Sequence, residues 1–228
     1  MKRWQNVMVD DSAMRCYVAE TRNVNSPGVL VCMHGPGVDA FIIDICDRLA
    51  LSGFVAIAPD LYHRQSKQPV EAREQIKDNE ALNDMARATS AMKALPSVDA
   101  HRLGVIGFCM GGRFSFLQAA NDPDLKASVV FHGGNIMVAR DSGLTPYEQA
   151  GNIRAPMLGL FGSDDQDPSP SDVKTIDSEL TRLGKMHKFY SYKGAGHAFL
   201  NFTRPSAFRE SQAKEAWTKC LEWLHQYL

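Results

Sequence analysis

The residues best suited to chemistry lie in a glycine-rich segment near the middle of the chain. This segment, 107–112 with the sequence GFCMGG, follows the apolar run 103–106 and precedes a helical pattern over residues 113–120. A strand, a sharp turn with a nucleophile at its centre and a helix form a nucleophile elbow, here with cysteine in place of serine. The glycines suit it because the backbone at such a nucleophile is strained and closely surrounded. The pattern predicts that Cys109 is a nucleophile.

Candidate partners for this cysteine follow other apolar runs. Three aspartates, Asp164, Asp165 and Asp167, come after the run 157–161, and His197 comes shortly after residues 188–192. The order of nucleophile, acid and histidine is that of the α/β-hydrolases. The histidine would carry a proton to and from the reacting groups, and an aspartate would hold its tautomer. The residues alone leave three aspartates as candidates for that acid.

Two backbone N–H groups complete the predicted machinery. The N–H groups of Met110, directly after the nucleophile, and of Gly35, after the run 29–33, could form an oxyanion hole. One such donor is typically worth about 3 kcal/mol. The start of a helix also favours the thiolate form of a cysteine. His34 and His132 follow strands as well, but no His or Cys pair has the spacing of metal ligands, so we expect no metal.

Apolar, β-branched runs alternate with helical patterns along the chain, which predicts an α/β fold. Strands are predicted at 6–9, 15–19, 29–33, 54–58, 103–108, 127–131, 157–161 and 188–192, and helices at 40–52, 71–95, 113–120, from 170 to about 183 and at 206–227. The first two strands are expected at an antiparallel edge. The others predict a mostly parallel sheet with helices on both faces. Sites in such sheets form outside the carboxyl ends of the strands, where the candidate groups fall.

Composition restricts the class of protein. A chain of 228 residues suits a single domain over residues 1–228, and a net charge of −1 gives no basic surface for nucleic acid. No apolar run approaches the roughly 18 residues of a transmembrane helix, and the first residues do not form a signal peptide. Five cysteines without a C-x-x-C pair favour a reducing compartment. We expect a cytoplasmic protein, monomeric or homodimeric, that needs no cofactor.

Several of these segments together resemble the dienelactone hydrolase family, the carboxymethylenebutenolidases, over residues 29–224. The resemblance rests on residues 59–65 (PDLYHRQ), the elbow, Gly162-x-x-Asp165 followed by Pro170, and residues 196–199 (GHAF). It implies an α/β-hydrolase fold with a cysteine nucleophile. Matched position by position, it implies the triad Cys109, Asp165 and His197 with an oxyanion hole at Gly35 and Met110, and so selects Asp165 among the three aspartates.

The resemblance also indicates substrate-binding residues. Arg73 matches a family arginine that binds the substrate carboxylate. His34 stands where the family has a glutamate beside the thiol, and an imidazole there would favour the thiolate at rest. Asn201 replaces a second family arginine, with Arg204 nearby. Segments 60–73 and 133–151 are expected to shape the pocket, and three residues are either its apolar walls or core: Tyr62, Met137 and Phe199.

The expected function is therefore the hydrolysis of small esters or lactones by a Cys-His-Asp triad through a thioester. One alternative is a general carboxylesterase or thioesterase in which Cys109 does the work of serine. A second is a catalytically idle α/β-hydrolase fold that binds a small molecule. Rapid alkylation of Cys109 at neutral pH would separate the enzymes from the idle protein.

Overall fold

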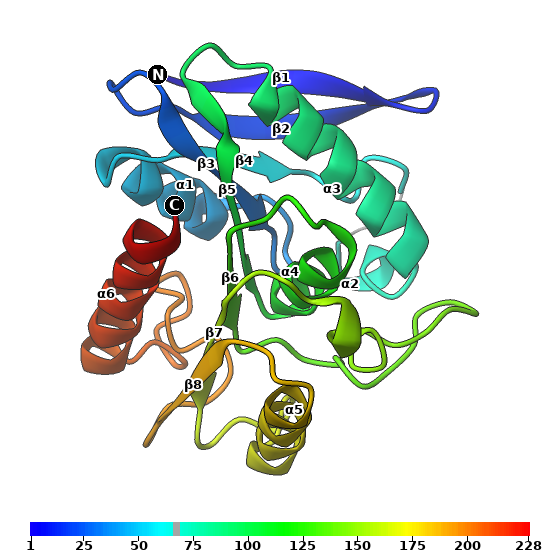
Figure 1. Cartoon of the computed structure of the whole chain (residues 1–228), viewed down its shortest axis with the longest axis vertical. Helices are drawn as coiled ribbons and strands as arrows, with labels where there is room; N and C mark the ends of the chain where they lie inside the picture. Colours follow the sequence, from blue (N-terminus) through cyan, green and yellow to red (C-terminus); the bar gives the residue numbers. More distant parts are fainter. Residues whose placement is uncertain (66–68) are drawn as a thin grey trace.

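The computed structural model describes residues 1–65 and 69–228, and one eight-stranded sheet crosses the molecule (Figure 1). The strands lie in the order β1-β2-β4-β3-β5-β6-β7-β8. Their bounds are β1 Lys2–Val9, β2 Ser12–Ala19, β3 Ser26–Cys32, β4 Val55–Pro59, β5 Val98–Phe108, β6 Ala127–Phe131, β7 Met157–Gly162 and β8 His187–Tyr192. Neighbours from β4 to β8 pair in parallel, whereas β2 is antiparallel to both β1 and β4.

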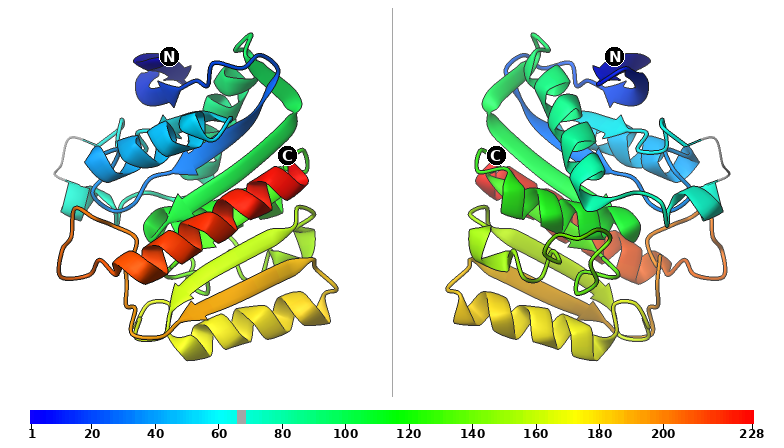
Figure 2. Two further views of the ribbon diagram at one scale, coloured as in Figure 1. Left: turned by 90° about the vertical axis from the view of Figure 1, so that its left-hand side faces the viewer. Right: turned by 90° about the vertical axis from the view of Figure 1, so that its right-hand side faces the viewer.

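Helices cover both faces of this sheet (Figures 1 and 2). Their bounds are α1 Ala40–Leu51, α2 Pro69–Ala72, α3 Asp78–Lys93, α4 Met110–Asn121, α5 Pro170–Arg182 and α6 Glu210–Tyr227, with a short 3-10 helix at Ala150–Asn152. Helices α1 and α6 lie on one face, and α3, α4 and α5 on the other. Strands buried on both faces need apolar residues throughout, which is why β4, β6 and β7 are buried along their whole length.

The predicted α/β fold with a mostly parallel sheet is confirmed, and each predicted strand is present. The N-terminal pair is antiparallel as predicted. Of these two strands, β1 lies at the edge of the sheet and β2 does not, because β2 also pairs with β4. In the parts of the chain that the structure describes, no helix is long and apolar enough to cross a membrane.

The predicted helix over residues 71–95 is present over Asp78–Lys93 as α3, but its continuity is wrong, because the chain leaves the helical conformation between α2 and α3. Lys77, just before α3, is extended with φ −85° and ψ 151°. The next residue, Asp78, is buried and receives a hydrogen bond from Arg113 Nε at 3.3 Å. A buried carboxylate needs such a partner, so this pairing fixes where α3 begins. Arg73 and Glu74 therefore lie on the turn before α3 instead of on a helix.

The parallel strands end almost level with one another. In the register, Cys32 of β3 faces Gly107 of β5, and Phe108 faces Phe131 of β6. At the other side of the site, Gly162 of β7 faces Tyr192 of β8. The segments that follow these strands are consequently brought to one edge of the sheet, which is where the sequence places its chemical groups.

Candidate active site

Cys109 lies at a tight strand-to-helix turn. Strand β5 ends at Phe108 and α4 begins at Met110, so Cys109 is the residue before the first helical turn, with φ 56° and ψ −119°. Glycine is required two residues before it, because a Cβ on Gly107 would lie 1.8 Å from the carbonyl oxygen of Gly111. This crowding is the physical reason for the glycines of the GFCMGG segment. The turn holds the cysteine at the end of the helix that favours a negative charge.

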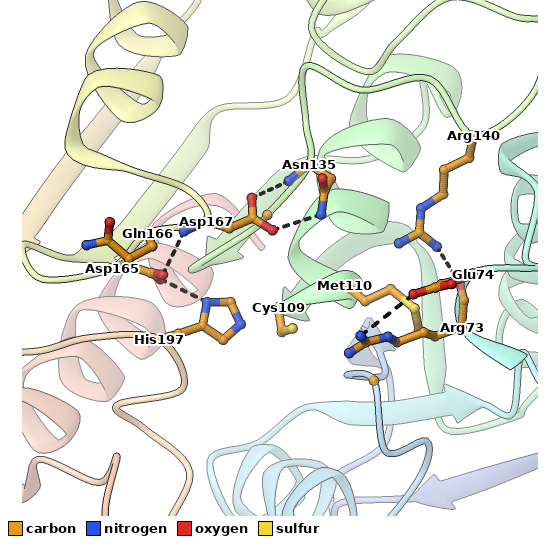
Figure 3. A pocket seen from close by; sticks show the side chains of 12 residues that line it. Arg73, Glu74, Cys109, Met110, Asn135, Arg140, Asp165, Gln166, Asp167 and His197 are labelled. Carbon is orange, nitrogen blue, oxygen red and sulfur yellow. Dashed lines mark hydrogen bonds and ion pairs between the residues drawn. The ribbon is translucent and has the colours of Figure 1, made fainter. Parts of the chain in front are cut away.

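Asp165 and His197 come together at the ends of β7 and β8. His197 Nδ1 lies 2.9 Å from Asp165 Oδ2, and the Asp165 side chain is 2% exposed (Figure 3). Burial by itself would lower the pKa of His197, but the hydrogen bonds and charges of Asp165 and Cys109 raise that pKa to about 10. The imidazole is therefore protonated at neutral pH, and its charge favours the thiolate form of the cysteine beside it.

The thiol of Cys109 is placed to ionise. Burial would raise its pKa, but the hydrogen bond and charge of His197, with the backbone N–H groups of Met110 and Gly35, bring the pKa below its ordinary value. These two N–H groups are the predicted oxyanion-hole donors. That of Met110 belongs to the first turn of α4, and that of Gly35 to the loop after β3. Two amides and an imidazolium around the sulfur thus favour its thiolate form, which is the reactive form of a cysteine.

Cys109 should be alkylated at pH 7 far faster than the other four cysteines. Burial raises the pKa of Cys16 to about 12 and also raises the pKa of Cys32, Cys46 and Cys220. The reaction can be followed by iodoacetamide labelling and peptide mass spectrometry between pH 5 and 10. Because His197 lowers the pKa of Cys109, His197→Asn should move the midpoint of the labelling curve to higher pH. Equal curves for both proteins would contradict the ion pair.

The three candidate aspartates have different environments. Asp165 is buried and contacts His197, whereas Asp164 is exposed and its Oδ1 accepts a hydrogen bond from Ser163 Oγ at 2.7 Å. Asp167 is also exposed and both its carboxylate oxygens are bound to Asn135, at 2.8 Å each. Of the three, the geometry therefore offers Asp165 as the partner of the histidine.

Asn135 and Asp167 link the loop after β6 to the loop that carries Asp165. The N–H of Asp167 donates to Asp165 Oδ1 at 3.0 Å, so the same residue contacts both Asn135 and the acid. Arg113 of α4 also donates to the carbonyl of Asn135. A Cβ on Gly134 would lie 2.5 Å from Asp167 Oδ2, so glycine is required for this approach. The link fixes one oxygen of Asp165 while the other contacts His197.

His132 contacts the backbone of Cys109. The N–H of Cys109 donates both to the carbonyl of Phe131 and to His132 Nδ1, each at 3.1 Å. Burial, with the charges of His197 and His34, holds the pKa of His132 well below its ordinary value, so its imidazole is neutral and Nδ1 can accept. Its ring also packs edge-on against that of His197, with 4.8 Å between centroids. The sequence placed His132 at the end of a strand but did not predict its hydrogen bond with Cys109.

A cavity of about 410 Å³ opens over Cys109 (Figure 3). It is lined by all five residues of the predicted triad and oxyanion hole: Gly35, Cys109, Met110, Asp165 and His197. Segment 133–151 was expected to shape the pocket, and it contributes Gly134, Asn135 and Arg140. From segment 60–73, Arg73 lines the cavity, and residues 66–68 lie outside the described part of the chain.

Five of the six expected substrate-binding residues lie outside this lining; only Arg73 belongs to it. His34 is buried, with Nε2 2.9 Å from Asp39 Oδ1, and its ring contacts Phe41. Its imidazole is thus turned toward the start of α1. The groups that lower the pKa of Cys109 are His197 and the two amides instead.

The other four have structural contacts of their own. The hydroxyl of Tyr62 donates to the carbonyl of Gly35 at 2.6 Å, which supports the loop after β3 from outside the cavity lining. Phe199 is fully buried against His132. Asn201 Oδ1 accepts from the N–H of Thr203 at 2.9 Å and so closes a turn. Arg204 is exposed on that turn, and Met137, a possible wall, also lies outside the cavity lining.

Arg140 lies within the segment 133–151 that was expected to shape the pocket, but no motif singled it out as a site residue. It lies in the irregular stretch between β6 and β7, with no motif and no periodicity around it.

Among residues 1–65 and 69–228, no group of three or more His, Cys, Asp or Glu side chains is arranged to hold a metal ion.

A mostly parallel sheet covered on both faces, with a nucleophile turn after a central strand, defines the α/β-hydrolase fold. The chain resembles the structure titled "Putative Dienelactone Hydrolase" from Klebsiella pneumoniae, with a TM-score of 0.90 and 32% identity over 100% of this chain and 99% of the other. Acylaminoacyl peptidase from Pyrococcus horikoshii shares the fold, with a TM-score of 0.81 at 14% identity over 100% of this chain and 41% of the peptidase.

The chain belongs to the dienelactone hydrolase family, whose sequence profile matches residues 14–228. A protein of Methylorubrum extorquens named "Putative carboxymethylenebutenolidase" is 35% identical over 213 residues, 88% of this chain and 72% of its own length. A Bradyrhizobium protein named "Probable 2-oxo-3-(5-oxofuran-2-ylidene)propanoate lactonase" is 31% identical over 89% of this chain and 84% of its own length. The expected family is confirmed, and the protein is a dienelactone hydrolase-like hydrolase.

Proposed function

We propose that this protein hydrolyses small esters or lactones through a thioester on Cys109. The observation that carries the proposal is the convergence of a thiol of lowered pKa, the His197–Asp165 pair and two backbone N–H groups on one cavity. A nucleophile, a base with its orienting acid, and an oxyanion hole are the parts that acyl transfer requires. The names of the relatives, carboxymethylenebutenolidase and lactonase, agree with a lactone or ester carbonyl as the reacting group.

In the first step, the thiolate of Cys109 attacks the carbonyl carbon of the substrate. The developing oxyanion accepts hydrogen bonds from the N–H groups of Gly35 and Met110, which already approach the sulfur. The tetrahedral intermediate collapses when its C–O bond breaks, and protonated His197 gives its proton to the leaving oxygen. The acyl group then remains on Cys109 as a thioester.

In the second step, His197 is neutral and can accept a proton from water. Water adds to the thioester carbonyl, the same two N–H groups stabilise the second oxyanion, and the C–S bond breaks to release the acid. The proton returns to His197, which restores the thiolate–imidazolium pair. Asp165 holds Nδ1 in both steps, so Nε2 faces the reacting groups. None of these steps uses a cofactor.

We further propose that the chain works as one domain in the cytoplasm. A single sheet includes strands from both ends of the chain, from β1 to β8. All five cysteines are free thiols, as expected for a protein of a reducing compartment.

The thioester can be tested by trapping it. The protein should hydrolyse 4-nitrophenyl acetate and a small lactone such as dihydrocoumarin, and acid quenching during turnover should leave an acyl group on the peptide that contains Cys109. His197→Ala should slow release of that acyl group, because water then lacks its base. Turnover with the acyl group on another residue, or hydrolysis that persists after Cys109 has been alkylated, would refute the proposal.

A further inference from the structure

One N–H group of the proposed oxyanion hole belongs to a glycine that its surroundings do not crowd. Apart from its chain neighbours, a Cβ on Gly35 would have one atom within ordinary contact distance, Cδ of Arg73 at 3.8 Å. Side-chain packing therefore does not fix the dihedral angles of this residue, and glycine has more conformational freedom than any other residue. The direction of its N–H must depend on the hydrogen bonds of the two peptide groups that flank it.

The first of these peptide groups is held within a tight turn. It contains the carbonyl of His34 and the N–H of Gly35, and that carbonyl accepts a hydrogen bond from the N–H of Gly37 at 2.9 Å. The second peptide group joins Gly35 to Pro36 and has no N–H, so its carbonyl is the only polar group through which it can be held. The orientation of Gly35 thus depends on what this carbonyl contacts.

Tyr62, on the turn after β4, contacts this carbonyl. Its hydroxyl donates to the carbonyl oxygen of Gly35 at 2.6 Å, and its ring lies beside Gly37, where a Cβ would be 3.6 Å from the nearest ring carbon. The hydroxyl oxygen is also 4.0 Å from Sδ of Met110, which carries the other N–H of the proposed hole. One side chain therefore touches both residues of the hole, although it does not line the cavity.

The backbone around Tyr62 is itself anchored to the sheet. The N–H of Tyr62 donates to Asp60 Oδ1 at 3.0 Å, and its carbonyl accepts from the N–H of Gln65 at 2.8 Å. The N–H of Asp60 in turn donates to the carbonyl of Arg15 in β2 at 2.8 Å. Burial raises the pKa of Tyr62 to about 12, so the hydroxyl keeps its proton and remains a donor at neutral pH.

The bond between Tyr62 and Gly35 has a structural explanation and a functional one. A buried tyrosine needs a hydrogen-bond acceptor wherever it lies, and on that ground alone the loss of the hydroxyl would lower only the stability of the fold. Here the acceptor is the residue whose N–H contacts the sulfur of Cys109. Loss of the hydroxyl should then also change the hydrogen bonding of the reacting carbonyl, which can be measured separately from stability.

We propose that Tyr62 is a positioning residue of the oxyanion hole, whose hydroxyl holds the peptide group after Gly35 so that the N–H of Gly35 stays directed at the reacting oxygen. The inference rests on the hydrolysis proposed above and adds to it a residue that acts without touching the substrate. Hydrogen bonds weaken steeply with misalignment, so a small rotation at Gly35 removes much of the stabilisation of the oxyanion.

Tyr62→Phe removes the hydroxyl and leaves the ring, so it tests this role directly. In the variant, kcat for 4-nitrophenyl acetate should fall about 20-fold, a part of the 10²- to 10³-fold lost when an oxyanion donor is removed altogether. KM should stay within about twofold of wild type, because the hole stabilises the transition state rather than the bound ester and serves both acylation and deacylation.

Tyr17→Phe is the matched control for this variant. Tyr17 is also buried, and its hydroxyl donates to Asp47 Oδ1 at 2.9 Å, outside the cavity lining. Each variant loses one hydroxyl hydrogen bond, so both should melt at a slightly lower temperature than wild type. Only Tyr62→Phe should lose activity. A loss of kcat in Tyr17→Phe as large as that in Tyr62→Phe would refute the positioning role.

The carbonyl of the thioester reports the oxyanion hole by a signal that stability does not change. Hydrogen bonds from the hole polarise this carbonyl and lower its stretching frequency. With a cinnamoyl group on Cys109 and an isotope label at its carbonyl carbon, difference infrared spectra should show the band at higher frequency in Tyr62→Phe than in wild type or Tyr17→Phe. Equal bands in all three proteins would refute the role of Tyr62. Absence of any acyl group on Cys109 in wild type would instead refute the proposed hydrolysis itself.

Discussion

Replacing Cys109 with alanine should lower kcat for hydrolysis of an aryl ester by on the order of 10⁶-fold, the loss found when a hydrolase nucleophile is removed. In the proposed mechanism, the two N–H groups and His197 that contact the sulfur act on a thioester bond that alanine cannot form. The residual rate, measured over spontaneous hydrolysis, would report what the oxyanion hole and binding supply by themselves.

Cys220→Ala is the matched control for this variant. Cys220 lies in α6, is fully buried and has a pKa raised by burial, so it is neither ionised nor part of the cavity lining. Its replacement should leave kcat near wild type while lowering the melting temperature, because a buried side chain is shortened. If Cys109→Ala retained a tenth of the wild-type rate, the nucleophile would have to be another residue.

Asp165→Asn should lower kcat by about 10⁴-fold with little change in structure, the effect of losing the acid of a triad. The amide can still contact His197 Nδ1, but it supplies no charge and allows the wrong tautomer. Because Asp165 helps to raise the pKa of His197, that pKa should also fall in the variant. Titration of the His197 signal by NMR, with kcat measured on the same ester, checks both effects.

Two neighbouring aspartates serve as controls for Asp165. Asp164→Asn should leave kcat near wild type, because this exposed side chain contacts Ser163 and not the histidine. Asp167→Asn should lower kcat about tenfold. Its backbone N–H still contacts Asp165, but its side chain binds Asn135 less strongly. A loss at Asp164 as large as that at Asp165 would transfer the role of the acid to Asp164.

The predicted elements and the observed ones differ where local pattern and tertiary contacts compete. Residues 71–95 contain no proline or glycine, so the sequence favours one long helix. The structure interrupts it because buried Asp78 must meet Arg113, a residue 35 positions later in the chain. No local sequence pattern indicates a pairing between distant elements. The break in the helix that accompanies it leaves Arg73 on a turn that lines the cavity.

The residues that the family resemblance assigned to substrate binding show the same limit of prediction from sequence. Phe199 and Asn201 follow His197 closely in sequence, which suggests that they share its site. The backbone turns at Ala198, whose φ is 62°, so Phe199 enters the core beside His132 and Asn201 closes the next turn. Arg140 shows the converse, because an irregular loop without periodicity carries a charged side chain into the cavity.

The sequence by itself determined the order of the strands, the strand-to-helix turn at Cys109 and the segments that end beside it. These features are local: apolar runs specify buried strands, and the glycines around the cysteine permit a turn that no other residues fit. Only the tertiary structure decided that Asp165 contacts His197, that His34 is turned away and that Arg140 faces the cavity. Those outcomes depend on the level ends of parallel strands and on contacts between residues far apart in the chain, which no short segment can encode.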